Sequence, residues 1–229
     1  MQKKSKFIAI EGLDGSGKST QIDLLIKHFE NQGQKVRFVH FPRSGEGVFG
    51  KMVARFLKGD YGSVAQVHPQ LVALMFAEDR KDFAPTLQSW LDEGSIVLMD
   101  RYVLSNIAFQ CAKTKDETEK AELRDWILDF EYQYNKIPKP HFSLFLEVPF
   151  SHTENTLKSR RTGAERDYLD GKDDIHEQDF ELQKAVKEEY DGLCKTDTDI
   201  KRIMCANEQN EMRSIEAIHQ IILKAIGEA

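Results

Sequence analysis

The stretch EGLDGSGKST, from Glu11 to Thr20, constrains the fold of this chain more than any other part of it. It fits the pattern G-x-x-x-x-G-K-[ST], with Gly12, Gly17, Lys18 and Ser19 at the fixed positions. The apolar run KFIAI precedes it and an amphipathic helical pattern follows it, which is the strand, loop and helix order that a phosphate-binding loop requires. We therefore predict an α/β domain that holds a nucleoside triphosphate after its first strand.

The loop itself is predicted to surround the phosphates. Its glycines let backbone N–H groups turn toward the anion, and the N-terminal dipole of the next helix adds to the attraction. Lys18 is expected to reach the β- and γ-phosphates, and the Ser19 hydroxyl is expected to bind Mg²⁺. The predicted phosphate-binding residues are Gly12, Leu13, Asp14, Gly15, Ser16, Gly17, Lys18, Ser19 and Thr20.

The rest of the chain alternates short apolar runs with amphipathic helical patterns. This alternation is typical of a parallel sheet with helices on both faces, so we expect a three-layer α/β fold with five strands. At 229 residues, positions 1–229 are predicted to form a single domain. The predicted strands are residues 6–10, 36–41, 96–100, 142–148 and 200–205.

One polar region interrupts this pattern at RRTGAERDYLDGKDDIHE, residues 160–177. It contains Gly163 and Gly171 and has almost no apolar periodicity. Stretches of this kind within a compact domain are often functional loops, so we predict a mobile lid at about 158–178.

Composition excludes several classes of protein. The net charge of −6 argues against a nucleic-acid-binding surface. No apolar run approaches the roughly 18 residues of a membrane span, and the N-terminus shows no targeting segment. Three scattered cysteines, without C-x-x-C spacing, indicate a reducing compartment. We expect a cytoplasmic protein with neither nucleic acid nor membrane as a partner.

The acidic end of the third strand indicates what kind of nucleotide site this is. Asp100 is expected to hold Mg²⁺ opposite the loop, directly or through water, although a carboxylate there could equally cap the next helix. A GTP-binding switch would need N-K-x-D, but Asn135 and Lys136 are followed by Ile137 and Pro138. A motor ATPase would carry a water-activating glutamate where Arg101 stands. Both classes are therefore disfavoured.

Arginines mark a second anion site instead. Arg43 and Arg101 close the second and third strands, and Arg80 lies in a helical pattern. Strand ends line the ligand crevice of an open parallel sheet, so these residues are expected to flank a second anion beside the triphosphate.

With these motifs in place, the chain resembles the thymidylate kinases over nearly its full length. The matching elements are EGLDGSGKST, FPRSG (41–45), MFAEDR (75–80), DRYVLSNIAF (100–109), IPKPH (137–141) and the arginine-bearing loop ending in Asp174-x-x-Glu177. The combination of FPR, F-A-x-D-R and D-R-Y followed by S-N is specific to this family. The resemblance implies phosphorylation of dTMP to dTDP by ATP with Mg²⁺.

The resemblance also implies a role for each matching position. Asp14 would hold the deoxyribose 3′-hydroxyl, and Arg43 and Arg101 would hold the acceptor phosphate. Phe76 would stack on thymine, Arg80 and Asn106 would address its edge, and Phe109 would lie beneath the sugar. The predicted dTMP-binding residues are Asp14, Phe41, Arg43, Phe76, Arg80, Arg101, Asn106 and Phe109.

Family members that lack a basic residue inside the phosphate-binding loop take catalytic arginines from the lid. This chain has Gly15 and Ser16 there, so the predicted catalytic residues are Lys18, Arg101, Arg160, Arg161 and Arg166. The resemblance further suggests a homodimer, formed through the apolar helices around 48–57 and 67–76. Three alternatives stay open at this point: another nucleoside monophosphate kinase, a deoxynucleoside kinase, and a nucleotide-binding regulator without turnover.

Overall fold

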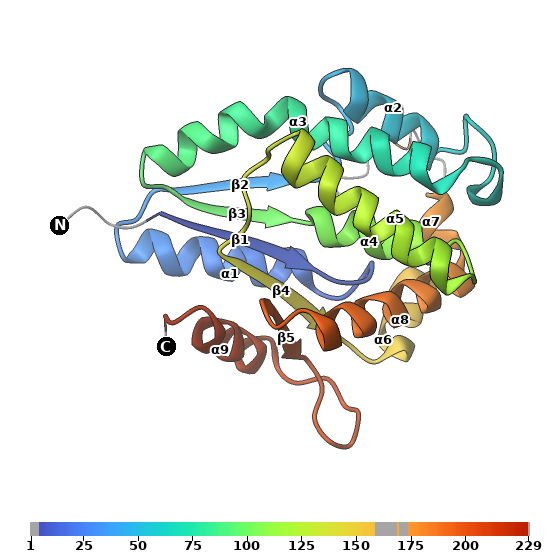
Figure 1. The fold of residues 1–229 in the computed structure, drawn as a ribbon. Helices are drawn as coiled ribbons and strands as arrows, with labels where there is room; N and C mark the ends of the chain where they lie inside the picture. Colours follow the sequence, from blue (N-terminus) through green and yellow to red (C-terminus); the bar gives the residue numbers. More distant parts are fainter. Residues whose placement is uncertain (1–4, 159–168, 170–173, 229) are drawn as a thin grey trace.

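A computed structural model describes residues 5–158, 169 and 174–228, and Figure 1 shows their fold. Among these residues, five parallel strands form one sheet in the order β2-β3-β1-β4-β5. The strands are β1 (Lys6–Glu11), β2 (Val36–His40), β3 (Ile96–Asp100), β4 (Phe142–Glu147) and β5 (Ile200–Met204). They confirm the five predicted runs to within one residue at each end.

Helices cover both faces of this sheet, as predicted for a three-layer fold (Figure 1). The α-helices are α1 (Lys18–Asn31), α2 (Val48–Leu57), α3 (Pro69–Asp92), α4 (Val103–Cys111), α5 (Glu117–Asp129), α6 (Phe150–Lys158), α7 (Ile175–Gln178), α8 (Phe180–Thr196) and α9 (Ile215–Ala225). A 3₁₀ segment, η1 (Val64–Gln66), precedes α3, and a π-helical segment, η2 (Phe130–Tyr134), follows α5.

Two apolar layers join the helices to the sheet because successive strand residues point to opposite faces. In β1, Phe7 and Ala9 pack with α3, α4, α5 and α8, whereas Ile8 and Ile10 pack with α1 and α9. Helix α2 lies outside this frame and packs against α3 through a smaller cluster that includes Val53. The central strand is thus buried on both sides, which explains its continuous apolar sequence.

The register of the strands brings three loops together. Ile10 of β1 and His40 of β2 both pair with Asp100 of β3, so these strands end at the same edge of the sheet. The loops that follow β1, β2 and β3 therefore begin side by side, and α1 starts beneath them (Figure 1). In an open parallel sheet this edge is the usual place for a ligand.

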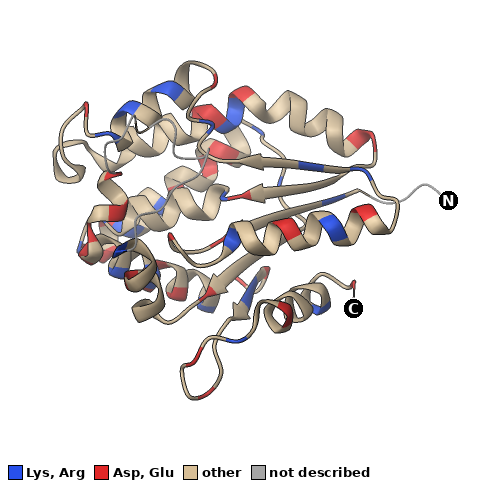
Figure 2. Ribbon diagram, turned by 180° about the vertical axis from the view of Figure 1, so that it is seen from behind, with Lys and Arg blue, Asp and Glu red and all other residues tan. Residues whose placement is uncertain are grey.

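The surface of the molecule carries mixed charge. Figure 2 shows Lys and Arg interspersed with Asp and Glu along the helices that are drawn in colour. Within the described residues, no helix combines the length and the apolar character that crossing a bilayer requires. Cys111, Cys194 and Cys205 are free thiols, and the first and last of them are buried.

Candidate functional site

The loop between β1 and α1 forms the floor of a cavity of about 650 Å³, which we call the loop cavity. Gly15 and Gly17 both have positive φ, at 75° and 86°, a conformation that favours glycine. The lining consists of Asp14, Gly15, Ser16, Gly17, Lys18, Ser19, Thr20, His40, Asp100, Arg101 and Thr156. Seven of the nine predicted phosphate-binding residues, 14–20, thus line the cavity. The backbone carbonyls of the other two, Gly12 and Leu13, accept hydrogen bonds from Lys18 at 3.4 and 2.9 Å.

Lys18 and Asp100 face one another across this cavity. The Lys18 Nζ lies 4.0 Å from the Asp100 Oδ1, and His40 Nδ1 lies 3.3 Å from the other carboxylate oxygen. Although burial raises it, the pKa of Asp100 is lowered overall because Lys18, His40 and Arg101 stabilise its charge. Its Oδ1 is buried and has no hydrogen-bond partner among the described residues. A buried anionic oxygen with no hydrogen-bond donor beside a phosphate-binding loop fits a Mg²⁺ ion, which prefers carboxylate and phosphate oxygens.

A second cavity of about 750 Å³ lies beside the first, and we call it the side cavity. Its walls combine the ends of β2 and β3 with α3, α4 and α7. The lining consists of Asp14, His40, Phe41, Pro42, Leu57, Phe76, Arg80, Arg101, Tyr102, Ser105, Asn106, Phe109, Gln110, Asp174, His176 and Glu177. Seven of the eight predicted dTMP-binding residues are in this list; Arg43 is the exception. Asp14, His40 and Arg101 line both cavities.

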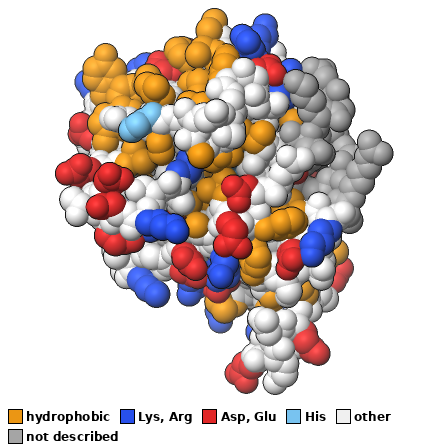
Figure 3. Space-filling model, turned by 90° about the vertical axis from the view of Figure 1, so that its right-hand side faces the viewer, with side chains coloured by type: hydrophobic (Ala, Val, Ile, Leu, Met, Phe, Trp, Pro, Cys, Tyr) orange, Lys and Arg blue, Asp and Glu red, His pale blue; other side chains and the backbone are white. Residues whose placement is uncertain are grey.

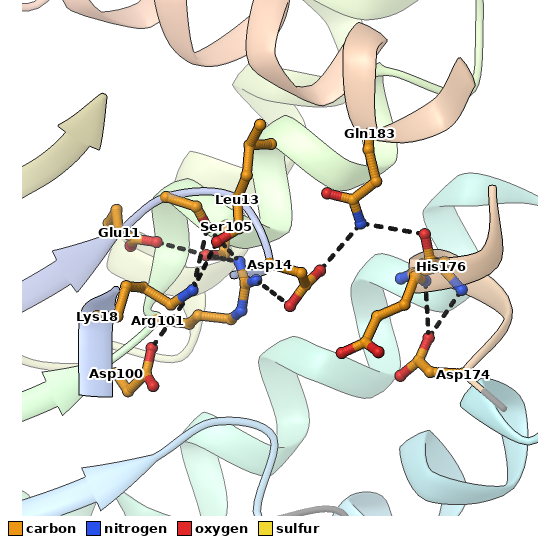
Figure 4. Close-up of polar contacts among 12 residues, drawn as sticks. Glu11, Leu13, Asp14, Lys18, Asp100, Arg101, Ser105, Asp174, His176 and Gln183 are labelled. Atoms are coloured by element: carbon orange, nitrogen blue, oxygen red, sulfur yellow. Dashed lines mark hydrogen bonds and ion pairs between the residues drawn. The ribbon is translucent and has the colours of Figure 1, made fainter. Parts of the chain in front are cut away.

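Arg101 lines both cavities, and its contact with Asp14 is shown in Figure 4. It follows β3 with a φ of 67°, which is uncommon outside glycine and holds the side chain back toward the loop. Its guanidinium donates to Gly12 O at 3.0 Å, Ser105 Oγ at 3.2 Å and Asp14 Oδ1 at 2.8 Å. Burial opposes the charge, but Asp14 and other acidic neighbours raise the pKa of Arg101 above its ordinary value. A permanent cation thus stands at the boundary of the cavities.

Glu11 binds residues that surround Arg101, and it was not among the residues predicted from the sequence. Its fully buried carboxylate accepts from Tyr102 N at 2.9 Å and from the hydroxyls of Ser105 and Tyr190. Burial raises its pKa despite these hydrogen bonds and the charge of Arg101. An acidic residue at the end of an apolar strand, directly before the loop glycine, was the available signal for it.

The far end of the side cavity holds the residues expected to meet a base. Phe76 and Arg80 come from α3, and Asn106 and Phe109 come from α4. Arg80 is buried against Glu131 of η2 with contacts of 2.6 and 2.5 Å. Phe109 lies under the Arg101 guanidinium, 4.9 Å from ring centroid to Cζ. The cavity therefore has a cationic end next to the loop and an aromatic end away from it.

Arg43 is engaged elsewhere. Its backbone N–H and guanidinium bind the buried carboxylate of Asp79 at 2.9 to 3.1 Å, and Nη2 also donates to Asp79 O. The neighbouring Phe41 and Pro42 do line the side cavity. The expected contact between Arg43 and an acceptor phosphate stays a prediction.

The C-terminal part of the predicted lid, residues 174–178, lies at the side cavity, where Asp174, His176 and Glu177 contribute to the lining. Asp174 caps α7 by accepting from His176 N at 2.7 Å, and the His176 ring stacks on Phe109 at 5.3 Å. Burial lowers the pKa of His176 far below its ordinary value, so the ring is neutral. Gln183 of α8 donates to Asp14 Oδ2 at 2.9 Å and to His176 O at 3.1 Å (Figure 4). Sequence analysis identified Asp174 and Glu177, but it gave no signal for His176 or Gln183. Arg160, Arg161 and Arg166 lie outside the described residues.

Comparison with known proteins agrees with this geometry. A phosphate-binding loop between β1 and α1 of an open parallel sheet, with a second cavity joined to it, defines a P-loop kinase of small molecules. Residues 10–217 match the thymidylate kinase family. The chain is 32% identical over 226 residues to a probable thymidylate kinase of Thermococcus kodakarensis, covering 96% of each protein. It is 33% identical over 186 residues to the thymidylate kinase of Mycobacterium tuberculosis, covering 81% of this chain and 84% of that one.

Solved structures show the same fold. A thymidylate kinase from Candida albicans superposes with a TM-score of 0.72 at 24% identity, covering 98% of this chain and 92% of that one. One from Ehrlichia chaffeensis superposes with a TM-score of 0.64 at 20% identity, covering 97% and 99%. The chain belongs to the thymidylate kinase family, whose reaction is the ATP-dependent phosphorylation of dTMP to dTDP.

Proposed function

We propose that this chain transfers the γ-phosphoryl group of ATP to dTMP at the boundary of the two cavities. ATP phosphates occupy the loop cavity and dTMP occupies the side cavity. The observation that carries this proposal is the shared wall: Asp14, His40 and Arg101 line both cavities. Two bound phosphates would therefore approach each other at Arg101, which is what transfer between them requires.

On the donor side, Lys18 binds the β- and γ-phosphates from the start of α1. Ser19 and Asp100 hold Mg²⁺, which supplies charge neutralisation on the phosphate oxygens when it is bound. The Asp100 Oδ1, buried without a hydrogen-bond partner among the described residues, supports this role. The loop N–H groups and the N-terminus of α1 bind the remaining phosphate oxygens.

On the acceptor side, Arg101 binds the phosphate of dTMP and Asp14 binds the 3′-hydroxyl. Arg43 assists Arg101, which requires its guanidinium to leave Asp79. Phe76 stacks on the thymine ring while Arg80 and Asn106 bind its polar edge. The ring of Phe109 lies under the sugar and leaves no room for a 2′-hydroxyl, which selects deoxyribonucleotides. Apart from Arg43, these residues all line one cavity, which supports the assignment.

The reaction needs no general base. A phosphate monoester has a second pKa of about 6, so the attacking oxygen is already anionic at neutral pH. The chain's own residues therefore position the two phosphates and stabilise the charge on the moving group. Lys18 and Arg101 do so from the described structure, and Arg160, Arg161 and Arg166 are proposed to do so from the lid. Lid closure would exclude water and so limit ATP hydrolysis.

Two further assignments belong to this proposal. The enzyme acts as a homodimer through α2 and the start of α3, where Val48 and Leu71 are exposed apolar side chains. It acts in the cytoplasm, in keeping with its three free thiols.

A panel of acceptors tests the proposed function. ADP release is measured at fixed Mg·ATP with dTMP, dUMP, dCMP, dGMP and thymidine. We expect dTMP to have the highest kcat/KM, followed by dUMP and then dCMP, with dGMP excluded by size. The 5-methyl group contributes about 1 kcal/mol of apolar burial, so dUMP is expected to be a poor but real substrate. Thymidine should be inert because its 5′-hydroxyl requires a base.

The alternatives predict different results. Thymidine as the best acceptor would indicate a deoxynucleoside kinase. A preference for dCMP or dGMP would indicate another monophosphate kinase. Nucleotide binding without turnover on any acceptor would indicate a regulator. Each of these three outcomes would refute the proposed reaction.

A further inference from the structure

Glu131 is a buried carboxylate immediately behind the base end of the side cavity. It lies in η2, the π-helical segment that follows α5, and its side chain has no exposed surface. Short π-helical segments often occur at functional sites because they displace a side chain from the regular helical position. Glu131 is not itself part of the cavity lining, but it contacts two residues that are, Arg80 and Asn106.

The first contact fixes the direction of the Arg80 guanidinium. Its Nε donates to Glu131 Oε2 at 2.6 Å and its Nη2 donates to Oε1 at 2.5 Å, a bidentate pair. Burial disfavours the guanidinium charge, but Glu131, together with Tyr102 and Asp79, raises the pKa of Arg80 above its ordinary value. The remaining nitrogen, Nη1, makes no hydrogen bond to a described residue. Arg80 therefore offers the side cavity a donor and cannot offer an acceptor.

The second contact fixes the direction of the Asn106 amide. One atom of this amide lies 3.0 Å from Ala73 O and 3.0 Å from Glu131 Oε1. A backbone carbonyl accepts hydrogen bonds and cannot donate them, so the amide atom next to Ala73 O must be Nδ2. The Asn106 Oδ1 then points the other way. It is buried and has no hydrogen-bond partner among the described residues.

The side cavity is thus lined by Arg80, which can only donate, and by Asn106, whose Oδ1 is the amide atom left to accept. Thymine has the complementary pair on one edge: O4 accepts and the neighbouring N3–H donates. Cytosine reverses both positions, because N4 carries an amino donor and N3 is an acceptor. If Asn106 were flipped, its amide would match N3 of cytosine instead. The carboxylate that holds Arg80 and Asn106 in these orientations is Glu131.

We propose that Glu131 is a positioning residue that sets the choice between thymine and cytosine by fixing the orientation of Arg80 and Asn106. This inference rests on the proposed function, since it assumes that the side cavity takes a pyrimidine monophosphate. Glu131 would thus affect the choice between thymine and cytosine without touching the base or the phosphate. A purely structural role, linking η2 to α3 and α4, would support every acceptor equally.

The test is the variant Glu131→Gln. A glutamine has one acceptor oxygen where the carboxylate has two, so its amino group must face either Arg80 Nε or the pair formed by Arg80 Nη2 and Asn106 Nδ2. A donor then faces a donor, and Arg80 turns or Asn106 flips. We expect the ratio of kcat/KM for dTMP to that for dCMP to fall about tenfold or more. The ratio for dTMP to dUMP should stay within about twofold, because uracil has the same O4 and N3–H groups.

The matched control is Glu78→Gln. Glu78 lies on α3 and also links this helix to the η2 region, because it accepts from Asn135 Nδ2 at 3.1 Å. In the described contacts it touches neither Arg80 nor Asn106. This variant loses the same charge and a similar link between elements, so both acceptor ratios should match the wild type. A folded Glu131→Gln enzyme whose dTMP to dCMP ratio equals that of Glu78→Gln would overturn the inference.

If Glu131→Gln does not fold, Glu131→Asp carries the test. It keeps the charge that balances Arg80 but withdraws the carboxylate by one methylene, so it cannot keep all three contacts. We expect its dTMP to dCMP ratio to fall at least about threefold with the dTMP to dUMP ratio unchanged. An unchanged dTMP to dCMP ratio would overturn the inference. Failure of the wild-type enzyme to use dTMP would instead refute the proposed function, so the two failures are distinguishable.

Discussion

At the scale of single residues, Lys18 is a buried cation at the start of α1. Its Nζ lies between the carbonyls of the loop and the Asp100 carboxylate. A charge held in a nearly dry site interacts more strongly with phosphate oxygens than it would in water. If the Lys18 side chain is removed, no other cation takes its place beside the phosphate oxygens.

Replacing Lys18 by alanine should therefore lower kcat by roughly 10²–10³, the usual effect of losing one electrostatic stabiliser of a transition state. The fold should remain, as measured by far-UV circular dichroism. Lys27→Ala is the matched control, since Lys27 is an exposed lysine on the same helix. Near-normal turnover of a folded Lys18→Ala protein would refute its assignment to the phosphates.

Lys113 is a half-buried side chain whose charged form costs stability. Its Nζ lies 5.0 Å from the Phe56 ring centroid and donates to Gln110 Oε1 at 2.6 Å. Burial lowers the pKa of Lys113 to about 7, below its ordinary value of 10.5. Between these two values the unfolded chain is protonated and the folded chain is largely neutral. The free energy of unfolding should therefore rise with pH between these two pKa values. Lys113 contributes at most about 1.4 kcal/mol to this rise per pH unit.

Lys113→Met should remove this dependence. At pH 7 the variant should be more stable than the wild type, by about 1 kcal/mol or more, and the difference should shrink as pH rises toward 9. Urea denaturation at pH 7, 8 and 9 measures it. Lys115→Met, at an exposed position two residues away, should show neither effect. A constant difference between Lys113→Met and wild type across this range would contradict the prediction.

At the scale of elements, α2 packs unusually close to the loop after β2. A Cβ added at Gly50 would lie 2.2 Å from Arg43 O and 3.2 Å from Asp79 Oδ1. Real Cβ atoms do not approach a backbone oxygen this closely, so the contact requires a glycine in the first turn of α2. The glycine sets the distance between α2 and the segment that includes Phe41 and Pro42 of the side cavity.

Gly50→Ala should push α2 away from that segment. We expect a destabilisation of roughly 1–3 kcal/mol, typical of overpacking, together with a raised KM for dTMP and little change in the KM for ATP. Gly192→Ala in α8 is the matched control, because no atom lies within 4 Å of its added Cβ. That variant should gain roughly 0.5–1 kcal/mol from the better helix former. Equal stability of the two variants would show that α2 is free to shift.

Strands and motif residues could be predicted from the sequence, whereas contacts between distant elements could not. The inner strands β1 and β3 were predictable because they are buried on both faces, which gives continuous apolar runs such as KFIAI. The edge strands β2 and β5 are partly exposed and have a weaker apolar pattern. Lys18, Asp100 and Arg101 were predictable because motif spacing and strand ends place them. The partners were not: Glu131 reaches Arg80 across 51 positions and Gln183 reaches Asp14 across 169. Such pairs depend on how elements pack, and no local periodicity records them.

At the scale of the whole molecule, the neighbouring helices α2 and α3 each carry an exposed large apolar side chain. Val48 of α2 is 67% exposed and Leu71 of α3 is 58% exposed, although both helices otherwise pack into a buried cluster. Figure 3 shows hydrophobic side chains gathered over the upper part of the face near these helices. Exposed apolar patches on soluble proteins often mark interfaces, which supports the proposed dimer.

Leu71→Glu should therefore dissociate the enzyme into monomers. The proposed dimer would bury this side chain in both subunits. A buried glutamate without a partner is costly, so the free energy of association should become less favourable by several kcal/mol. Light scattering coupled to size-exclusion chromatography gives the mass. The fold should be unchanged because Leu71 is mostly exposed within one subunit.

Ile215→Glu is the control: Ile215 is 49% exposed but begins α9, on the opposite face of the sheet from α3. A wild-type protein that elutes as a monomer, or a Leu71→Glu protein that stays dimeric, would refute this interface.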